Sequence, residues 1–209
     1  MNRRQLLTAA TITAATTGLT IAPAHATPGA GFTDDFTTHR RNWIDVGGSW
    51  IRQHGTLQTR SSGTDRSLHT VRTRSTYAGL WLVARVRHTG PGSMSLITNG
   101  AAGHRNAAGE WGPSYRFGYT AAGQVFIARI NPNFTRTFLL PPEPDDAVDP
   151  RGWNEIKVVS VDSYQSLQVN GGSFHVTTDP EVPVGYVGLA GLGAGSLTSV
   201  DRIQVSPVG

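Results

Sequence analysis

The sequence predicts an all-β protein in which two antiparallel sheets pack face to face as a jelly-roll sandwich. Three observations favour this fold class. About a dozen short runs alternate apolar and polar residues, the period of a pleated strand with one buried face. Glycine, proline and Asn-Gly turn signals separate these runs at close intervals. No segment has the apolar period of a helix, and the 25 glycines and 12 prolines show no repeat length, which argues against a propeller or a solenoid.

The most informative stretch is 153–171, WNEIKVVSVDSYQSLQVNG, which predicts two paired strands. Apolar residues recur at every second position in both halves, at 156–158 and at 167–169, as a half-buried antiparallel pair requires. Asn170 and Gly171 then supply the positive backbone angles of a tight turn.

Large apolar residues between glycine-rich turns predict the first strands. The segment 31–57 places Phe36, Trp43, Trp50 and Leu57 at intervals that suit one large core side chain per strand.

The other predicted strands alternate in the same way. In the strand 78–88 the even positions 80–86 are apolar and are predicted to face the core, whereas Trp81, Arg85 and Arg87 lie on the opposite, open face. Two stretches lack a strand pattern: the loop 100–113 and the Pro/Asp-rich loop 141–150. The remaining predicted strands are 66–71, 93–99, 115–120, 124–130, 134–140, 173–178, 186–192 and 197–205.

Several phrases resemble those of concanavalin A-like (lectin/glucanase, laminin-G-like) β-sandwich domains. They are DDF…W…GG.W…G.L at 34–57, WN.I.V…VNG at 153–171, GYVGL at 185–189 and the last strand at 200–205, and keto-disaccharide hydrolase-like relatives share the same skeleton. The resemblance covers essentially the whole chain after residue 26. It implies a jelly roll that carries glycans across its concave sheet, with specificity from the loops at the rim. Its motifs define a fold and carry little chemistry.

The first residues predict a secretory signal peptide. Arg3 and Arg4 precede an apolar, Thr-rich run and the small-x-small site at 24–26. The adjacent arginines favour the twin-arginine route, and the run is too short and too Thr-rich for the alternative, a membrane anchor. We therefore expect a cleaved segment 1–26, a single domain 27–209 and a secreted protein.

Charge and cysteine content exclude some partners. The formal charge is +4, and without Arg3 and Arg4 the balance is 16 basic against 14 acidic residues. That excess is too small to indicate nucleic acid or a membrane surface as the partner. The absence of cysteine means that the domain folds without disulfides, and we expect a monomer.

A glycan is the expected partner, polysaccharide or oligosaccharide. Sugars offer apolar C–H faces to aromatic rings and hydroxyl groups to polar side chains. The loop 100–113 concentrates such side chains between glycines and alanines. The alternative for each candidate is a place in the core or on the solvated surface. The candidate ligand-binding residues are Trp81, Arg85, Arg87, Arg105, Trp111, Tyr115 and Arg129.

Catalysis is the alternative function. Glycoside hydrolysis generally uses two carboxylates that flank the bond. The ExDxxE strand of laminarinase-type sandwiches and the RxE and QxH strands of alginate lyases are both missing. If the protein is an enzyme, Glu110 and His104 are the candidate acid–base pair on the loop 100–113.

A structural calcium ion is a further candidate, although no cofactor is required. Domains of this family often bind calcium near the first strand, and Asp34, Asp35 and Asp201 occupy matching places. The alternative is that these are surface or turn aspartates. No Cys/His cluster indicates zinc.

Three functions therefore remain open: a secreted lectin-like binding protein, a small glycan hydrolase or lyase, and a structural or inhibitory secreted protein without a sugar ligand.

Overall fold

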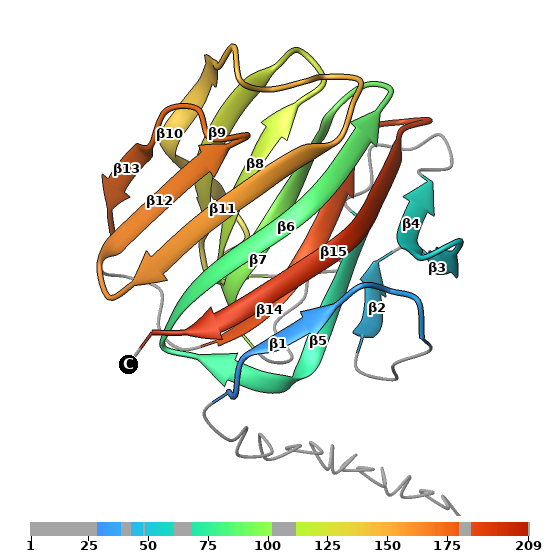
Figure 1. The fold of residues 1–209 in the computed structure, drawn as a ribbon. Coiled ribbons are helices and arrows are strands. Elements are labelled where there is room, and N and C mark those ends of the chain that lie inside the picture. Colours follow the sequence, from blue (N-terminus) through green and yellow to red (C-terminus); the bar gives the residue numbers. More distant parts are fainter. Residues whose placement is uncertain are drawn as a thin grey trace, which may run out of the picture.

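Two stacked antiparallel sheets make up the chain, which a computed structural model describes for residues 29–38, 43–47, 49–60, 68–101, 112–179 and 185–208 (Figure 1). The predicted signal segment 1–26 and residues 102–111 of the predicted loop lie outside these ranges. The described residues form fifteen strands and no helix. The prediction of an all-β, two-sheet sandwich is confirmed.

The eight-stranded sheet lies in front in Figure 1. Its order is β13 (His175–Thr178), β12 (Tyr164–Val169), β11 (Asn154–Val161), β6 (Gly79–Thr89), β15 (Leu197–Pro207), β4 (Thr56–Arg60) and β3 (Trp50–Gln53), and β1 (Phe32–Asp34) also pairs with β15.

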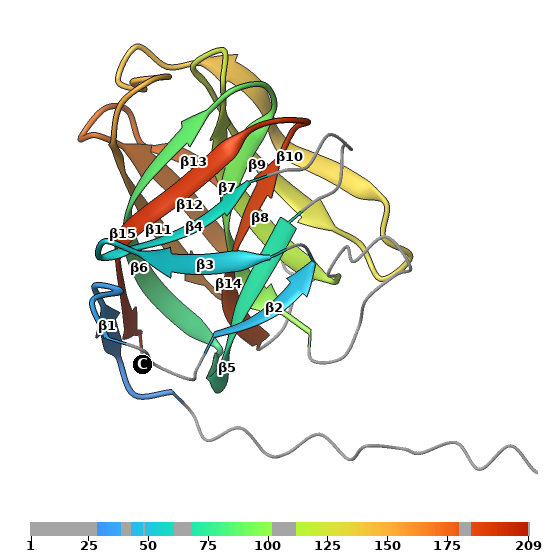
Figure 2. The ribbon, with the colours of Figure 1, turned by 90° about the vertical axis from the view of Figure 1, so that its right-hand side faces the viewer.

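The seven-stranded sheet lies behind it. Its order is β10 (Arg136–Pro144), β9 (Gln124–Ile130), β8 (Ser114–Thr120), β7 (Ser93–Gly100), β14 (Gly185–Leu192), β5 (Leu68–Tyr77) and β2 (Trp43–Gly47). The edge at which β3 and β4 of one sheet face β2 and β5 of the other is turned toward the viewer in Figure 2.

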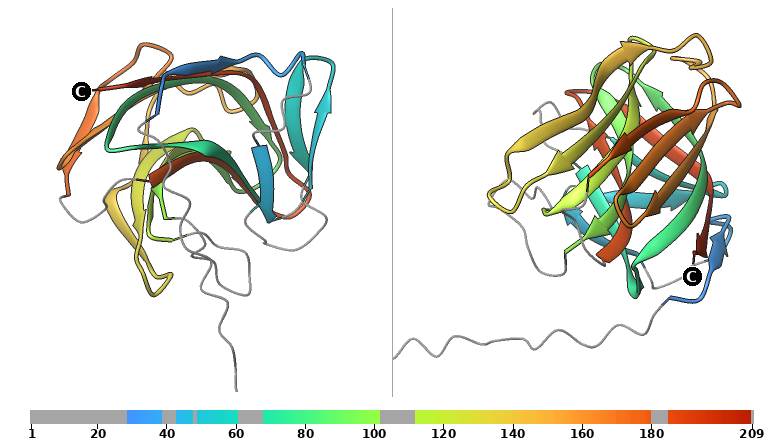
Figure 3. Two further views of the ribbon diagram at one scale, coloured as in Figure 1. Left: turned by 90° about the horizontal axis from the view of Figure 1, so that it is seen from below. Right: turned by 90° about the vertical axis from the view of Figure 1, so that its left-hand side faces the viewer.

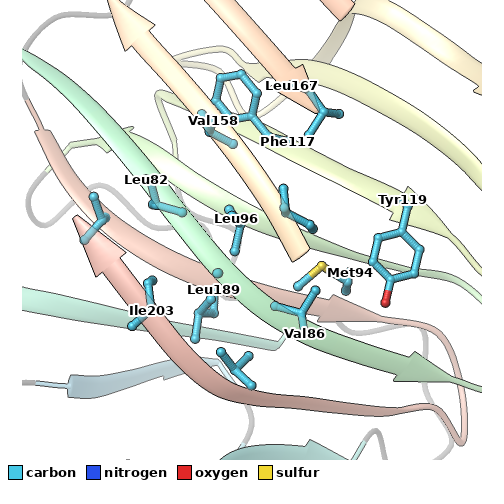
Figure 4. Packing of buried hydrophobic residues seen from close by; sticks show 14 of the residues in the cluster. Leu82, Val86, Met94, Leu96, Phe117, Tyr119, Val158, Leu167, Leu189 and Ile203 are labelled. Carbon is cyan, nitrogen blue, oxygen red and sulfur yellow. The ribbon is translucent and has the colours of Figure 1, made fainter. Parts of the chain in front are cut away.

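The core fills the space between the sheets (Figure 4). The even residues of β6 face it, as predicted, and Leu82, Ala84 and Val86 are fully buried. Of the four core side chains predicted in the first strands, Phe36, Trp50 and Leu57 belong to the core, and Trp43 packs against it.

The predicted hairpin at 153–171 is confirmed. β11 and β12 pair antiparallel, and Asn170 and Gly171 follow with φ angles of 48° and 75°. The Asn170 side chain accepts a hydrogen bond from the backbone N–H of Glu155 at 2.7 Å and donates one to the carbonyl oxygen of Ala147 at 2.7 Å. The turn residue therefore also fastens the loop that precedes β11.

The structure differs from the prediction at β10. Prolines led to the prediction of a loop from residue 141, but the strand continues to Pro144. β10 is an edge strand with two register shifts, between Phe138 and Leu140 and between Leu140 and Glu143. Proline is tolerated at edge strands and at bulges, and β10 has both features. β5 is also longer than predicted and reaches Tyr77.

Both sheets curve in the same sense (Figure 3). The outer face of the seven-stranded sheet curves inward, and we call it the concave face. The outer face of the eight-stranded sheet curves outward, and we call it the convex face. Strand β7 is buried at seven consecutive positions, 94–100, so side chains on both of its faces are covered. Strand β6 is buried on its inner face only.

Candidate functional site

The concave face contains a small, shallow hollow of about 20 Å³. Hydroxyl groups, two guanidinium groups and an aromatic ring border it, a mixture that suits a ligand with both polar groups and apolar faces. The lining residues come from five neighbouring strands and are Ser93, Ser95, Arg116, Phe126, Arg136, Ala190 and Leu192.

Arg116 is the buried cation of this hollow. Its neighbours on β8, Tyr115 and Phe117, point into the core, so the alternation of the strand turns Arg116 to the concave face. Only 3% of Arg116 is exposed. A guanidinium group stays charged at any ordinary pH and carries five N–H donors in a planar array. The wall of the hollow therefore holds a permanent positive charge.

A partly exposed aromatic ring lies beside two of the lining residues, Phe126 and Arg136. Phe138 on β10 is 43% exposed, and its ring meets that of Phe126 edge-on, with the centroids 6.2 Å apart and an interplanar angle of 87°. The guanidinium carbon of Arg136 lies 6.0 Å from the centroid of the Phe138 ring. Contacts with Phe126 and Arg136 thus hold an exposed ring at the edge of the hollow.

Carboxylates are absent from the central part of the concave sheet. The five strands β9, β8, β7, β14 and β5 contain no aspartate or glutamate. Asp45 on β2 and Glu143 on β10 lie in strands at opposite edges of the sheet, about 29 Å apart by strand spacing. Paired catalytic carboxylates in glycosidases lie about 5–9.5 Å apart. The described strands of this sheet therefore offer no such pair.

The predicted residues Trp81, Arg85 and Arg87 lie on the opposite side of the molecule. All three belong to β6 and face the convex side. Half of the Trp81 surface is exposed. By strand rise, Trp81 and Arg87 are about 20 Å apart, so the three side chains line one strand without converging on a point.

Two of the predicted residues, Arg85 and Arg87, contact the ring of Trp153. The guanidinium carbons of Arg85 and Arg87 lie 5.1 and 5.0 Å from the centroid of its ring. Arg85 also donates to Asp201 Oδ2 at 2.8 Å. Partial burial raises the pKa of Asp201, and the charge of Arg85 offsets part of that rise. A β-bulge in β15 between Val200 and Arg202 contains Asp201, which pairs with Arg85.

The predicted residues Tyr115 and Arg129 both form hydrogen bonds to Asp179. Tyr115 is fully buried, and its hydroxyl donates to the carbonyl oxygen of Asp179 at 2.8 Å, so its ring cannot stack on a ligand in this arrangement. One nitrogen of Arg129, Nη1, donates to both carboxylate oxygens of Asp179 at 2.8 Å, and its Nε donates to Asn131 at 2.8 Å.

The loop candidates His104, Arg105, Glu110 and Trp111 lie outside the described residues. The described chain stops at Ala101, just after β7, and resumes at Gly112, just before β8. Their predicted roles stay predictions.

The three predicted calcium ligands are each engaged by other groups. Asp34 accepts from the backbone N–H of Phe36 and from Trp43 Nε1, both at 2.9 Å. Asp35 accepts from the N–H and the hydroxyl of Thr37, and Asp201 accepts from Arg85. Within the described ranges, no three His, Cys, Asp or Glu side chains gather as metal ligands. Calcium binding stays a prediction, which a thermal-shift titration with calcium tests.

A buried histidine lies beside the core. The ring of His88 on β6 contacts the hydroxyl of Thr198 through Nδ1 at 2.9 Å and the carbonyl oxygen of Pro91 through Nε2 at 3.2 Å. Because a carbonyl oxygen only accepts, we infer that Nε2 carries the proton and that Thr198 donates to Nδ1. Burial lowers the pKa of His88, and it raises the pKa of the adjacent Tyr119 to about 12.

Sequence reasoning missed the residues around the hollow. Arg116 had a usable signal, because a charged residue between two aromatic core residues must point to the other face of its strand. Phe126 and Phe138 had none, because apolar residues in a strand pattern look like core residues.

No helix in the described part of the chain is long and apolar enough to span a membrane.

Comparison with known proteins shows the fold. No protein-family model matches the sequence, and no curated protein matches it. Among solved structures, the chain is similar to a family-66 carbohydrate-binding module from Bacillus subtilis, with 15% identity, a TM-score of 0.61 and coverage of 80% of this chain and 93% of that one. It is similar to a Bacillus subtilis protein of unknown function with a galectin-like fold, with 14% identity, a TM-score of 0.64 and coverage of 86% and 97%. It is also similar to SCLam, a non-specific endo-β-1,3(4)-glucanase of family 16, with 11% identity, a TM-score of 0.59 and coverage of 85% and 91%. At these identities the similarity concerns the fold, a concanavalin A-like jelly roll.

Proposed function

We propose that the protein is a secreted carbohydrate-binding protein whose ligand lies on the concave face, across the small hollow. The observation that carries the proposal is the exposed ring of Phe138, which contacts Phe126 and Arg136, two residues that line the hollow of the concave face. A sugar offers an apolar face to such a ring and hydroxyl oxygens to such a guanidinium group. The structural neighbours include a carbohydrate-binding module and glycan-active enzymes, which supports the same class of ligand.

Binding without turnover fits the described site better than hydrolysis. The central strands of the concave sheet carry no carboxylate, whereas hydrolysis by the usual route needs two of them beside the bond. The remaining enzymatic alternative uses Glu110 with His104 on the loop that connects β7 and β8. Release of new reducing ends from a polysaccharide, abolished by Glu110→Gln, would favour that alternative.

We extend the proposal to export. Arg3 and Arg4, the apolar run after them and the small residues at 24–26 are the features of a twin-arginine signal. A folded jelly roll without disulfides is compatible with a route that exports folded proteins.

Removal of the rim aromatic tests the binding site. We expect Phe138→Ala to weaken binding to a soluble oligosaccharide about tenfold, in line with the loss of one aromatic anchor. Arg136→Gln is expected to weaken it less, because glutamine keeps groups that hydrogen-bond to a sugar hydroxyl. The measurement is isothermal titration calorimetry with oligosaccharides chosen from a first screen of polysaccharides by affinity electrophoresis.

The matched control is Phe174→Ala, because Phe174 is also an exposed phenylalanine but lies beside β13 of the other sheet. It is expected to leave the affinity unchanged. Equal affinities of Phe138→Ala and the unmodified protein, with both folded, would rule out the concave site.

A further inference from the structure

The convex face carries exposed apolar side chains at one end. Trp81, Tyr164 and Val176 are 50%, 42% and 50% exposed, although they lie on three different strands. Val208, just beyond β15, is also exposed. Single exposed apolar residues are ordinary, but a contiguous group on a soluble domain marks a contact surface.

The strand register shows that these residues are neighbours. One row across the sheet pairs Ser206 with Trp81, Trp81 with Val159, Val159 with Ser166, and Ser166 with Val176. The adjacent row pairs Gly79 with Val161, Val161 with Tyr164, and Tyr164 with Thr178. The backbone N–H of Val208 donates to the carbonyl oxygen of Gly79, which adds Val208 to the second row. We call this surface the apolar strip; it consists of Trp81, Val159, Val161, Tyr164, Val176 and Val208.

The apolar strip contains no charge. The ten positions of the two rows are apolar residues, glycine, serine or threonine. Farther along the same strands the convex face is highly charged, with Arg85, Glu155, Lys157, Asp201 and Arg202. The strip lies where β6 begins and β15 ends, close to the C-terminus (Figure 1).

The dimensions of the strip suit a sugar chain and are too small for a stable protein interface. It crosses five strands, β15, β6, β11, β12 and β13, so it is about 19 Å long by strand spacing, and its two rows make it about 10 Å wide. Its area is thus on the order of 200 Å², whereas a stable protein–protein interface needs about 800 Å² from each partner. A strip of this length spans several sugar rings.

We propose that the apolar strip is a second glycan-contact surface, which lays Trp81 and Tyr164 against a neutral, chain-like polysaccharide. This inference takes its ligand class from the proposed function, but its residues lie on the other sheet from the hollow. Exposed aromatic side chains on a sheet offer flat apolar area to sugar faces, and the lack of charge favours an uncharged polymer over an acidic one. The two surfaces together would let one molecule contact an insoluble polysaccharide on two sides.

The test compares retention on insoluble, neutral polysaccharides (microcrystalline cellulose, chitin and a β-1,3-glucan) for the unmodified protein and its variants. Trp81→Ala and Tyr164→Ala are each expected to weaken retention about tenfold, and Trp81→Tyr to weaken it less, because it keeps an aromatic ring. High salt is expected to leave retention unchanged, since the strip has no charge. The matched control is Ile51→Ala, an exposed apolar residue on β3 of the same sheet, away from the strip.

Two further measurements separate this proposal from the proposed function. Trp81→Ala is expected to bind a soluble oligosaccharide as tightly as the unmodified protein, because the hollow is intact. Thermal unfolding confirms that each variant is folded. Unchanged retention of folded Trp81→Ala and Tyr164→Ala on every polysaccharide would overturn the proposal even if the hollow binds sugar. A change in oligomeric state of these variants, measured by light scattering, would also overturn it, because the strip would then contact a second copy of the chain.

Discussion

Asp179 is expected to be a structural residue whose loss lowers the stability of the sandwich and leaves its sugar affinity unchanged. The carboxylate of Asp179 is 5% exposed and the side chain of Arg129 is 15% exposed, so the pair is largely shielded from water. Asp179→Asn removes the negative charge that the guanidinium group of Arg129 contacts at 2.8 Å. Breaking a buried ion pair in this way costs about 3–5 kcal/mol of unfolding free energy. We expect about 3 kcal/mol, because one nitrogen serves both oxygens and the stronger two-nitrogen fork is missing.

Urea unfolding followed by tryptophan fluorescence measures this loss. The double variant Arg129→Met with Asp179→Asn is expected to be more stable than the sum of the two single losses predicts, because no unpaired charge stays buried. Oligosaccharide affinity, measured below the unfolding transition, is expected to be unchanged. The reasoning would be refuted if Asp179→Asn changed stability by less than about 1 kcal/mol, or if Arg129→Met lost affinity at unchanged stability, as a ligand-binding arginine would.

Two further predictions concern pH and export. Burial lowers the pKa of His88 below its ordinary 6.5, so the unfolded chain binds the proton more readily and the unfolding free energy falls as pH drops below about 6.5. The midpoint of urea unfolding should therefore fall less steeply in His88→Gln than in the unmodified protein between neutral and mildly acidic pH. Parallel curves for the two proteins would contradict this. Replacement of Arg3 and Arg4 by lysine is expected to stop export through the twin-arginine route, seen as unprocessed protein in cell extracts; undiminished processed protein in the medium would contradict it.

The fold was predictable because its signals are local. The Asn-Gly turn at 170–171 marks the end of a strand, and the alternation of β6 specifies which face of that strand is buried. Neither signal requires knowledge of the rest of the chain. The length of β10 was not predictable, because proline ends a central strand but is tolerated at an edge, and a sequence does not state which strands are edges.

The candidate site was harder to predict because central strands of the concave sheet, such as β7 and β8, are buried on both faces. On β6 the outer face is partly exposed and the inner face is buried, so the alternation of the sequence separates Trp81, Arg85 and Arg87 from the core. On β8 six consecutive positions are buried, and hydrophobicity no longer distinguishes the inner face from the outer one. A tyrosine such as Tyr115 suits both a core and a sugar site, and the sequence alone does not distinguish the two. The adjacent Arg116 faces the hollow instead. A shift of one residue along a strand exchanges its two faces, so the single charged side chain of β8 is better evidence for the open face than any of its aromatic ones.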